Sequence, residues 1–188
     1  METSPTVLIV EDERMLGDLF ATWLEPEYDV RVAYDGEDAL ELVDEHVDMA
    51  ILDRRMPGLS GDEVLEAIRG RGFDFPIAMV TAVDPDFDIV EMEFDDYLVK
   101  PIERGALLSL VSDLVSLPTY EEAVQEYFQL ASKKAALEAA KTETELASSE
   151  EYTELLDQYT QAKHRADTTI ETIADDLDFA DLDKKTDF

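Results

Sequence analysis

Short apolar runs alternate with amphipathic stretches over the first 118 residues. The apolar runs predict five strands, at Thr6–Val10, Tyr28–Ala33, Met49–Leu52, Ile77–Val80 and Tyr97–Val99. Apolar positions at helical spacing predict helices between them, over Glu13–Leu24, Gly36–Glu45, Gly61–Arg69 and Glu103–Leu117, with a shorter one within Asp86–Phe94. Strands that alternate with helices predict an α/β fold, a doubly wound five-stranded parallel sheet with helices on both faces.

The remaining residues have helical apolar spacing without turn residues. All seven glycines lie at or before Gly105 and all seven prolines at or before Pro118, and these residue types mark turns. We therefore expect two domains, residues 1–118 and 119–188, the second an all-α segment of two antiparallel helices at about 119–147 and 149–177. The pattern Ser148-x-x-Glu151 has the form of a capping box where the second helix would begin. Residues 175–188 are expected to form a solvated acidic tail.

The apolar stripe of these two helices is too narrow to form a core of its own. We expect it to pack against the partner helix, the first domain or a second copy of the chain. The heptad pattern is irregular, since Lys134 and Lys141 interrupt it, so a long regular coiled coil is not expected.

Charge limits the class of function. The 188 residues include 47 acidic and 15 basic side chains, a net charge of −32, and the acids are spread along both parts of the chain. Such a surface repels nucleic acid and anionic membranes over most of its area. In molar salt the Debye length is about 3 Å, which screens this self-repulsion. We therefore expect a halophilic source.

Other classes are excluded by composition. The chain has no cysteine, which rules out disulfides and thiolate zinc sites, and its two histidines, His46 and His164, argue against a histidine-based metal cage. No apolar run approaches the ~20 residues of a membrane span, and the first residues lack a signal-peptide pattern. A cytoplasmic location is expected.

Polar groups suited to phosphate chemistry follow four of the five predicted strands. Glu11 and Asp12 follow the first, Asp53 the third, Thr81 the fourth and Lys100 the fifth. A flavodoxin-like strand order of 2-1-3-4-5 brings these ends together in one crevice. Three carboxylates there need a cation, and oxygen-only ligands favour Mg²⁺ or Mn²⁺. Asp53 could accept a phosphoryl group as an acyl phosphate, with Lys100 and Thr81 available to its oxygens.

With these residues in place, the first part resembles the receiver domain of two-component response regulators. The resemblance covers about residues 5–117. The matching pieces, in order along the chain and each at a predicted strand end, are 7–13, 51–61, 80–82 and 95–101.

The resemblance implies that Asp53 is phosphorylated by a partner histidine kinase. It implies a Mg²⁺ site with four ligands: Glu11, Asp12, Asp53 and the backbone carbonyl of Arg55. The chain would not be an enzyme toward other substrates, because it would catalyse only its own Mg-dependent phosphoryl acceptance and hydrolysis.

The resemblance also implies how a phosphoryl group would be held and sensed. Thr81 and Lys100 would hold it, and Tyr97 would be an aromatic switch that turns inward when Thr81 moves. The Lys100–Pro101 bond is expected to be cis. One departure from the family is that only 19 positions separate Thr81 from Lys100. The fourth helix is therefore expected to be short or irregular, which puts dimerisation through that face in doubt.

Residues 119–188 are similar to the HalX-type C-terminal domain found behind receivers in halophilic archaea. The favoured output is a phosphorylation-switched interaction of this helical hairpin or coiled coil, including pairing as a homodimer. The alternative is a DNA-binding transcription regulator acting through residues 119–188, for which the available basic residues are Lys133, Lys134, Lys141, Lys163 and Arg165. A stand-alone relay and a metal-dependent phosphatase remain as minor alternatives, and for the phosphatase the sequence offers no general base.

Overall fold

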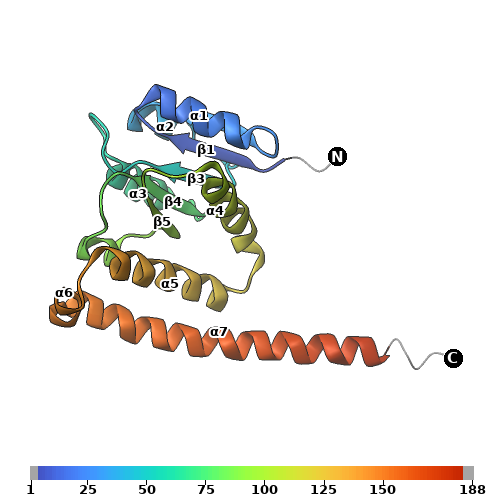
Figure 1. Cartoon of the computed structure of the whole chain (residues 1–188). Helices are drawn as coiled ribbons and strands as arrows, with labels where there is room; N and C mark the ends of the chain where they lie inside the picture. Colours follow the sequence, from blue (N-terminus) through green and yellow to red (C-terminus); the bar gives the residue numbers. More distant parts are fainter. Residues whose placement is uncertain (1–3, 184–188) are drawn as a thin grey trace.

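The computed structural model describes residues 4–183, with side chains as far as Glu171 (Figure 1). Its centre is a parallel sheet of five strands in the order β2-β1-β3-β4-β5, as predicted. The strands are β1 (Thr6–Val10), β2 (Asp29–Ala33), β3 (Met49–Leu52), β4 (Ile77–Thr81) and β5 (Asp96–Val99).

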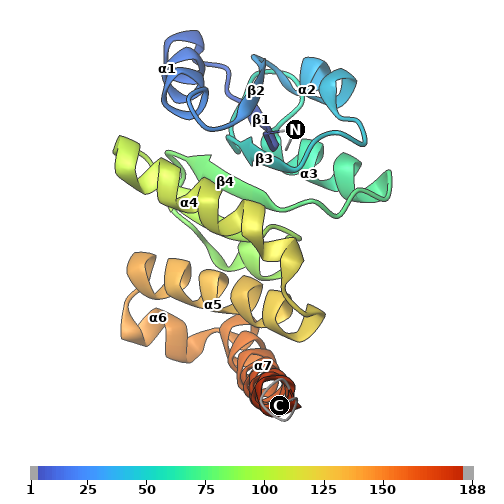
Figure 2. The ribbon, with the colours of Figure 1, turned by 90° about the vertical axis from the view of Figure 1, so that its right-hand side faces the viewer.

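Helices cover both faces of the sheet, as Figure 2 shows. One face carries α1 (Arg14–Leu24) and α4 (Arg104–Ser116), and the other carries α2 (Gly36–Leu42) and α3 (Gly61–Gly70). Each face of the sheet has its own hydrophobic core. The side chains of β1 contribute to both cores, because successive side chains of a strand point to opposite faces. Leu8 and Val10 lie in the cluster under α2 and α3, and Val7 and Ile9 in the cluster under α1 and α4.

The segment between β4 and β5 holds a single 3-10 helix, η1 (Phe87–Glu91). The short spacing from Thr81 to Lys100 predicted a reduced element here, and the structure confirms it. Asp86 caps this turn by accepting a hydrogen bond from the Phe87 backbone N–H at 2.8 Å. Ile89 anchors it to the core, since its side chain is fully buried.

After α4 the chain passes through η2 (Leu117–Thr119) into three helices, α5 (Glu122–Ala140), α6 (Glu143–Ser148) and α7 (Glu150–Asp183). The prediction of one helix over 119–147 was wrong, because a capping box interrupts it. The Thr142 hydroxyl accepts from the Glu145 backbone N–H, and the Glu145 carboxylate accepts from the Thr142 N–H at 2.8 Å. These bonds satisfy backbone donors that a continuous helix would otherwise use, so a new helix begins.

The second predicted cap is displaced by one residue. The backbone N–H of Tyr152 donates to the Ser149 hydroxyl at 3.1 Å, whereas the Ser148 hydroxyl donates back to the Thr144 carbonyl at 2.8 Å. Ser149 rather than Ser148 therefore caps α7. This helix also continues to Asp183, past the expected end at 177, so the expected tail of 175–188 is helical in its first part; residues 184–188 lie outside the described residues.

The C-terminal helices pack against the first domain as well as against each other. In Figures 1 and 2, α5 lies between the β5 side of the sheet and α7. Leu130 and Leu137 of α5 and Leu155 of α7 belong to the same buried cluster as the sheet core. Of the three expected partners for this stripe, the structure therefore shows two, the partner helix and the first domain.

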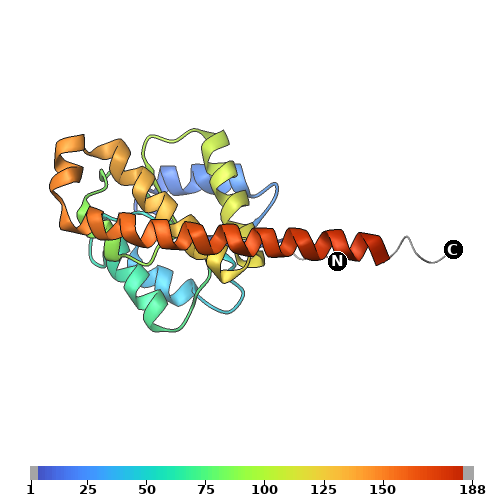
Figure 3. The same cartoon turned by 90° about the horizontal axis from the view of Figure 1, so that it is seen from below.

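Figure 3 shows α7 crossing the molecule and extending past its globular part. It is the longest described helix, with 34 residues, but it is strongly acidic. Among residues 4–183 no helix combines the length and apolar character needed to cross a bilayer.

Candidate functional site

Strand register brings the predicted site residues together. Val10, the last residue of β1, lies opposite Leu52, the last residue of β3. The residues that follow, Glu11 and Asp53, therefore emerge side by side, and the Asp53 backbone N–H donates to the Val10 carbonyl at 3.0 Å.

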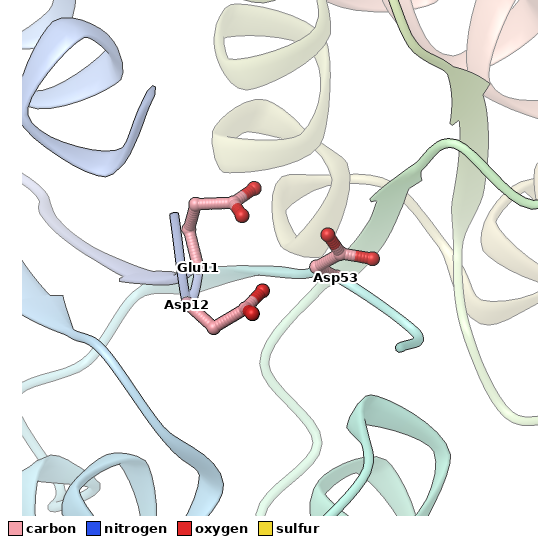
Figure 4. Close-up of side chains that lie close together, drawn as sticks. All are labelled: Glu11, Asp12 and Asp53. Carbon is pink, nitrogen blue, oxygen red and sulfur yellow. The ribbon is translucent and has the colours of Figure 1, made fainter. Parts of the chain in front are cut away.

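The three predicted carboxylates form one cluster (Figure 4). Glu11, Asp12 and Asp53 each offer an oxygen within 4.8 Å of the others. Glu11 and Asp53 are buried and Asp12 is half-buried. Burial raises the pKa of Glu11 above its ordinary value, although its bonds with Lys100 and the Glu13 backbone oppose this. The cluster thus concentrates negative charge where water is largely excluded.

Lys100 supplies one positive charge to this cluster. Its Nζ lies 2.5 Å from Glu11 Oε2 and 2.7 Å from Asp53 Oδ2. Burial lowers the pKa of Lys100, but hydrogen bonds to these two carboxylates outweigh that effect and raise it overall. A single ammonium group does not neutralise the negative charge of three carboxylates. The all-oxygen set therefore fits a hard divalent cation such as Mg²⁺.

Arg55 follows the cluster on the loop after β3. Its backbone N–H donates to Asp53 Oδ1 at 3.2 Å, which places this backbone next to the Asp53 carboxylate. Metal ligation by its carbonyl stays a prediction.

Thr81 and Tyr97 connect the cluster to the β4–β5 segment. Thr81 is fully buried, and its hydroxyl donates to Asp53 Oδ1 at 2.7 Å. The Val83 N–H donates to the Thr81 hydroxyl at 3.3 Å, and the Tyr97 hydroxyl donates to the Val83 carbonyl at 2.7 Å. Tyr97 is itself buried. The Lys100–Pro101 bond is cis, as the resemblance implied.

Sequence reasoning missed Arg54, the residue after Asp53. Its guanidinium makes two hydrogen bonds to Asp62 of α3, at 2.9 and 2.8 Å, and one to Asp88 of η1, at 2.5 Å. The side chain is only 8% exposed, and its hydrogen bonds to Asp62 and Asp88 raise its pKa despite burial. The Asp88 contact spans 34 positions, so no local pattern could have revealed it.

The basic residues considered for DNA binding do not form an open stripe. Lys133 is buried and its Nζ donates to the Val90 carbonyl at 2.8 Å. Three others form ion pairs within the chain: Lys134 with Glu138, Lys141 with Asp86 and Arg165 with Glu126. Lys163 is exposed.

Known proteins match both parts of the chain. Residues 7–112 match the response regulator receiver domain family, and residues 116–183 match the HalX domain family. A protein of Haloferax volcanii named "Putative transcriptional regulator" is 49% identical over 138 residues, which is 73% of this chain and 24% of that protein. The chain therefore spans about a quarter of this relative, whose halophilic source agrees with the expectation from charge.

Solved structures of receiver domains resemble the first part. The receiver domain of the Francisella response regulator 1452 is 30% identical with a TM-score of 0.57, covering 62% of this chain and 99% of that one. The Thermotoga maritima response regulator protein TrrA, in complex with Mg(2+)-BeF, is 32% identical with a TM-score of 0.51, covering 58% of this chain and 97% of that one. The chain thus belongs to the two-component response regulators, with a receiver domain followed by a HalX domain.

Proposed function

We propose that Asp53 is the phosphoacceptor of this response regulator and that a partner histidine kinase in the cytoplasm supplies the phosphoryl group. One observation carries the proposal. Asp53 lies buried at the end of β3 between the Lys100 ammonium and the Thr81 hydroxyl, beside two further carboxylates. A carboxylate held between a cation and a hydroxyl donor is arranged to take up a phosphoryl group and to bind its oxygens.

In the proposed transfer, an Asp53 oxygen attacks phosphorus. The new O–P bond forms as the N–P bond of the kinase phosphohistidine breaks, and the imidazole nitrogen keeps the electron pair. Mg²⁺ bound by Glu11, Asp12, Asp53 and the Arg55 carbonyl would neutralise charge on the phosphoryl oxygens. Lys100 and Thr81 would hold those oxygens, and both already contact Asp53. Water would later hydrolyse the acyl phosphate, so no external substrate is turned over.

Intact-protein mass spectrometry tests the acceptor. The full chain is incubated in molar KCl with MgCl₂ and a small acyl phosphate donor. The expected result is the mass of one added phosphoryl group, absent in Asp53→Asn and present in Asp74→Asn, a matched change at an exposed acid. Unchanged labelling of Asp53→Asn would refute the assignment.

The output we propose is a changed interaction of the C-terminal helices, including pairing with a second copy. Helix α7, which extends past the globular body, carries Ile170, which is 54% exposed. Light scattering in molar KCl with Mg²⁺ and beryllofluoride measures this pairing. An increase in molar mass with beryllofluoride that is absent in Asp53→Ala supports pairing with a second copy. If the mimic binds and the molar mass stays constant, the C-terminal helices do not pair in response to it, and the output would be an interaction with another partner.

DNA binding through residues 119–188 is the second candidate, favoured by the name of the Haloferax relative. The internal ion pairs of Lys141 and Arg165 speak against it, because they occupy the cations that phosphates would need. Band shifts with genomic fragments in molar KCl separate the two candidates. A salt-resistant shift that depends on beryllofluoride would favour DNA binding.

A further inference from the structure

The turn η1 contacts both Arg54, the residue after Asp53, and the C-terminal helices. On the site side, Arg54 bonds to Asp88 within η1. On the other side, Lys133 of α5 donates to the Val90 carbonyl, and Lys141 pairs with Asp86 at 2.9 Å. Helix α7 also packs against η1.

Arg54 is placed to respond to the state of Asp53. It is the next residue in the chain, and its guanidinium lies against the Tyr97 hydroxyl as well as Asp88. Tyr97 in turn holds the Val83 carbonyl, next to Thr81, whose hydroxyl now binds Asp53. A phosphoryl group on Asp53 would compete for that hydroxyl and so disturb the contacts of Tyr97 with Val83 and Arg54.

The Arg54–Asp88 contact is suited to transmit such a change. Arg54 is fixed by two parallel bonds to Asp62 of α3, so it is a rigid support rather than a mobile side chain. The side chain of Asp88 is 55% exposed and belongs to a short 3-10 turn. A single turn with few internal hydrogen bonds can shift while α3 stays in place.

From this geometry we infer that Arg54 is a positioning residue that couples phosphorylation of Asp53 to the placement of the C-terminal helices, through its ion pair with Asp88 on η1. The inference rests on the proposed function of Asp53. In this inference, phosphorylation of Asp53 acts on the C-terminal helices through the contacts of η1 with α5 and α7. Asp88 is the residue of η1 that responds to Arg54, which α3 holds in place.

Distance measurements between spin labels test this on the full chain. The protein has no cysteine, so labels attach only at introduced sites, Glu41→Cys on α2 and Gln158→Cys on α7, both exposed in the structure. The distance is measured in molar KCl with Mg²⁺, with and without beryllofluoride. Binding of the mimic is followed separately by fluorine NMR.

Three variants separate coupling from stability. Arg54→Ala removes the guanidinium. Asp88→Asn keeps the size of the side chain and leaves the bonds between Arg54 and Asp62 in place, but removes the negative charge that pairs with Arg54. Glu91→Gln is the matched control, since it makes the same change on the same turn at an exposed acid for which the described part of the chain shows no ion pair.

The expected result is that beryllofluoride changes the label distance by about 2 Å or more in the otherwise unmodified protein and in Glu91→Gln, the scale of helix shifts at switching interfaces. In Arg54→Ala and Asp88→Asn the mimic still binds, but at least half of this change is lost. A full response in Asp88→Asn overturns the inference, as does a mimic that binds without changing the distance. Failure of the mimic to bind at all would instead reject the proposed role of Asp53.

Discussion

Gln129 of α5 donates a hydrogen bond to Asp95, the residue before β5, with 2.8 Å between Nε2 and Oδ1. Asp95 is 3% exposed and also accepts from the Ile77 backbone N–H at 2.8 Å. Burial raises the pKa of Asp95, while the bonds to Gln129 and Ile77 oppose this. A helix of the HalX domain thus helps to satisfy a buried carboxylate of the receiver, and this hydrogen bond joins the two domains.

We expect Gln129→Ala to lower the free energy of unfolding by about 2 kcal/mol, because a hydrogen bond to a charged group contributes about 1.5–3 kcal/mol. Denaturant unfolding in molar KCl measures this. Gln158→Ala on the exposed face of α7 is the control and should have little effect. Equal stability of the two variants would mean that Asp95 does not depend on α5.

Removing the ammonium at the site should make the protein depend more on Mg²⁺. In Lys100→Met, Glu11 and Asp53 lose their cation, and breaking such a buried pair costs about 3 kcal/mol or more. Added MgCl₂ should then raise the melting temperature more than it does in the unmodified protein, since a ligand that binds only the folded state stabilises it. Lys134→Met, which removes a lysine paired on the surface of α5, serves as control. An equal Mg²⁺ effect in all three proteins would contradict this prediction.

Gly61 is required by the loop that follows Asp53. A Cβ at this position would lie 1.9 Å from the Asp53 carbonyl oxygen, so the backbone itself would have to move. Gly61→Ala should destabilise by about 3 kcal/mol or more and weaken binding of beryllofluoride. Gly70→Ala, where a Cβ meets nothing within 4 Å, should be neutral or slightly stabilising. Thermal melts of the two variants decide between these outcomes.

Tyr152 links the stability of the α5–α7 pair to pH. Burial, together with the hydrogen bond of its hydroxyl to Glu138 at 2.7 Å, raises the pKa of Tyr152 from 10.0 to about 12. The folded state therefore holds this proton more tightly than the unfolded state, and the resulting stability, complete below pH 10, is lost as pH rises toward 12. Unfolding is measured at several pH values. As pH rises toward 12, the free energy of unfolding should fall less steeply in Tyr152→Phe than in Tyr120→Phe, the control, which changes a tyrosine that is 53% exposed. Identical slopes would refute the assignment.

The receiver half was predictable because its signals are local. Alternation of apolar runs and helical stretches follows from which face of each element is buried, and the strand order then fixes where Glu11, Asp53 and Lys100 must meet. The errors lay in the C-terminal helices. There the break at Thr142 and the cap at Ser149 depended on which of several similar hydroxyl residues competes best for a backbone N–H.

The sequence by itself thus determined the sheet, the acidic cluster and the helical character of the second domain. Only the tertiary structure decided where that domain lies. Its docking on the β5 edge and η1 depends on contacts between distant residues, such as Lys133 with Val90 and Gln129 with Asp95, which no periodicity encodes. The same holds for Arg54 and Asp88, because they are 34 positions apart and their ion pair forms only after packing has brought the two segments together.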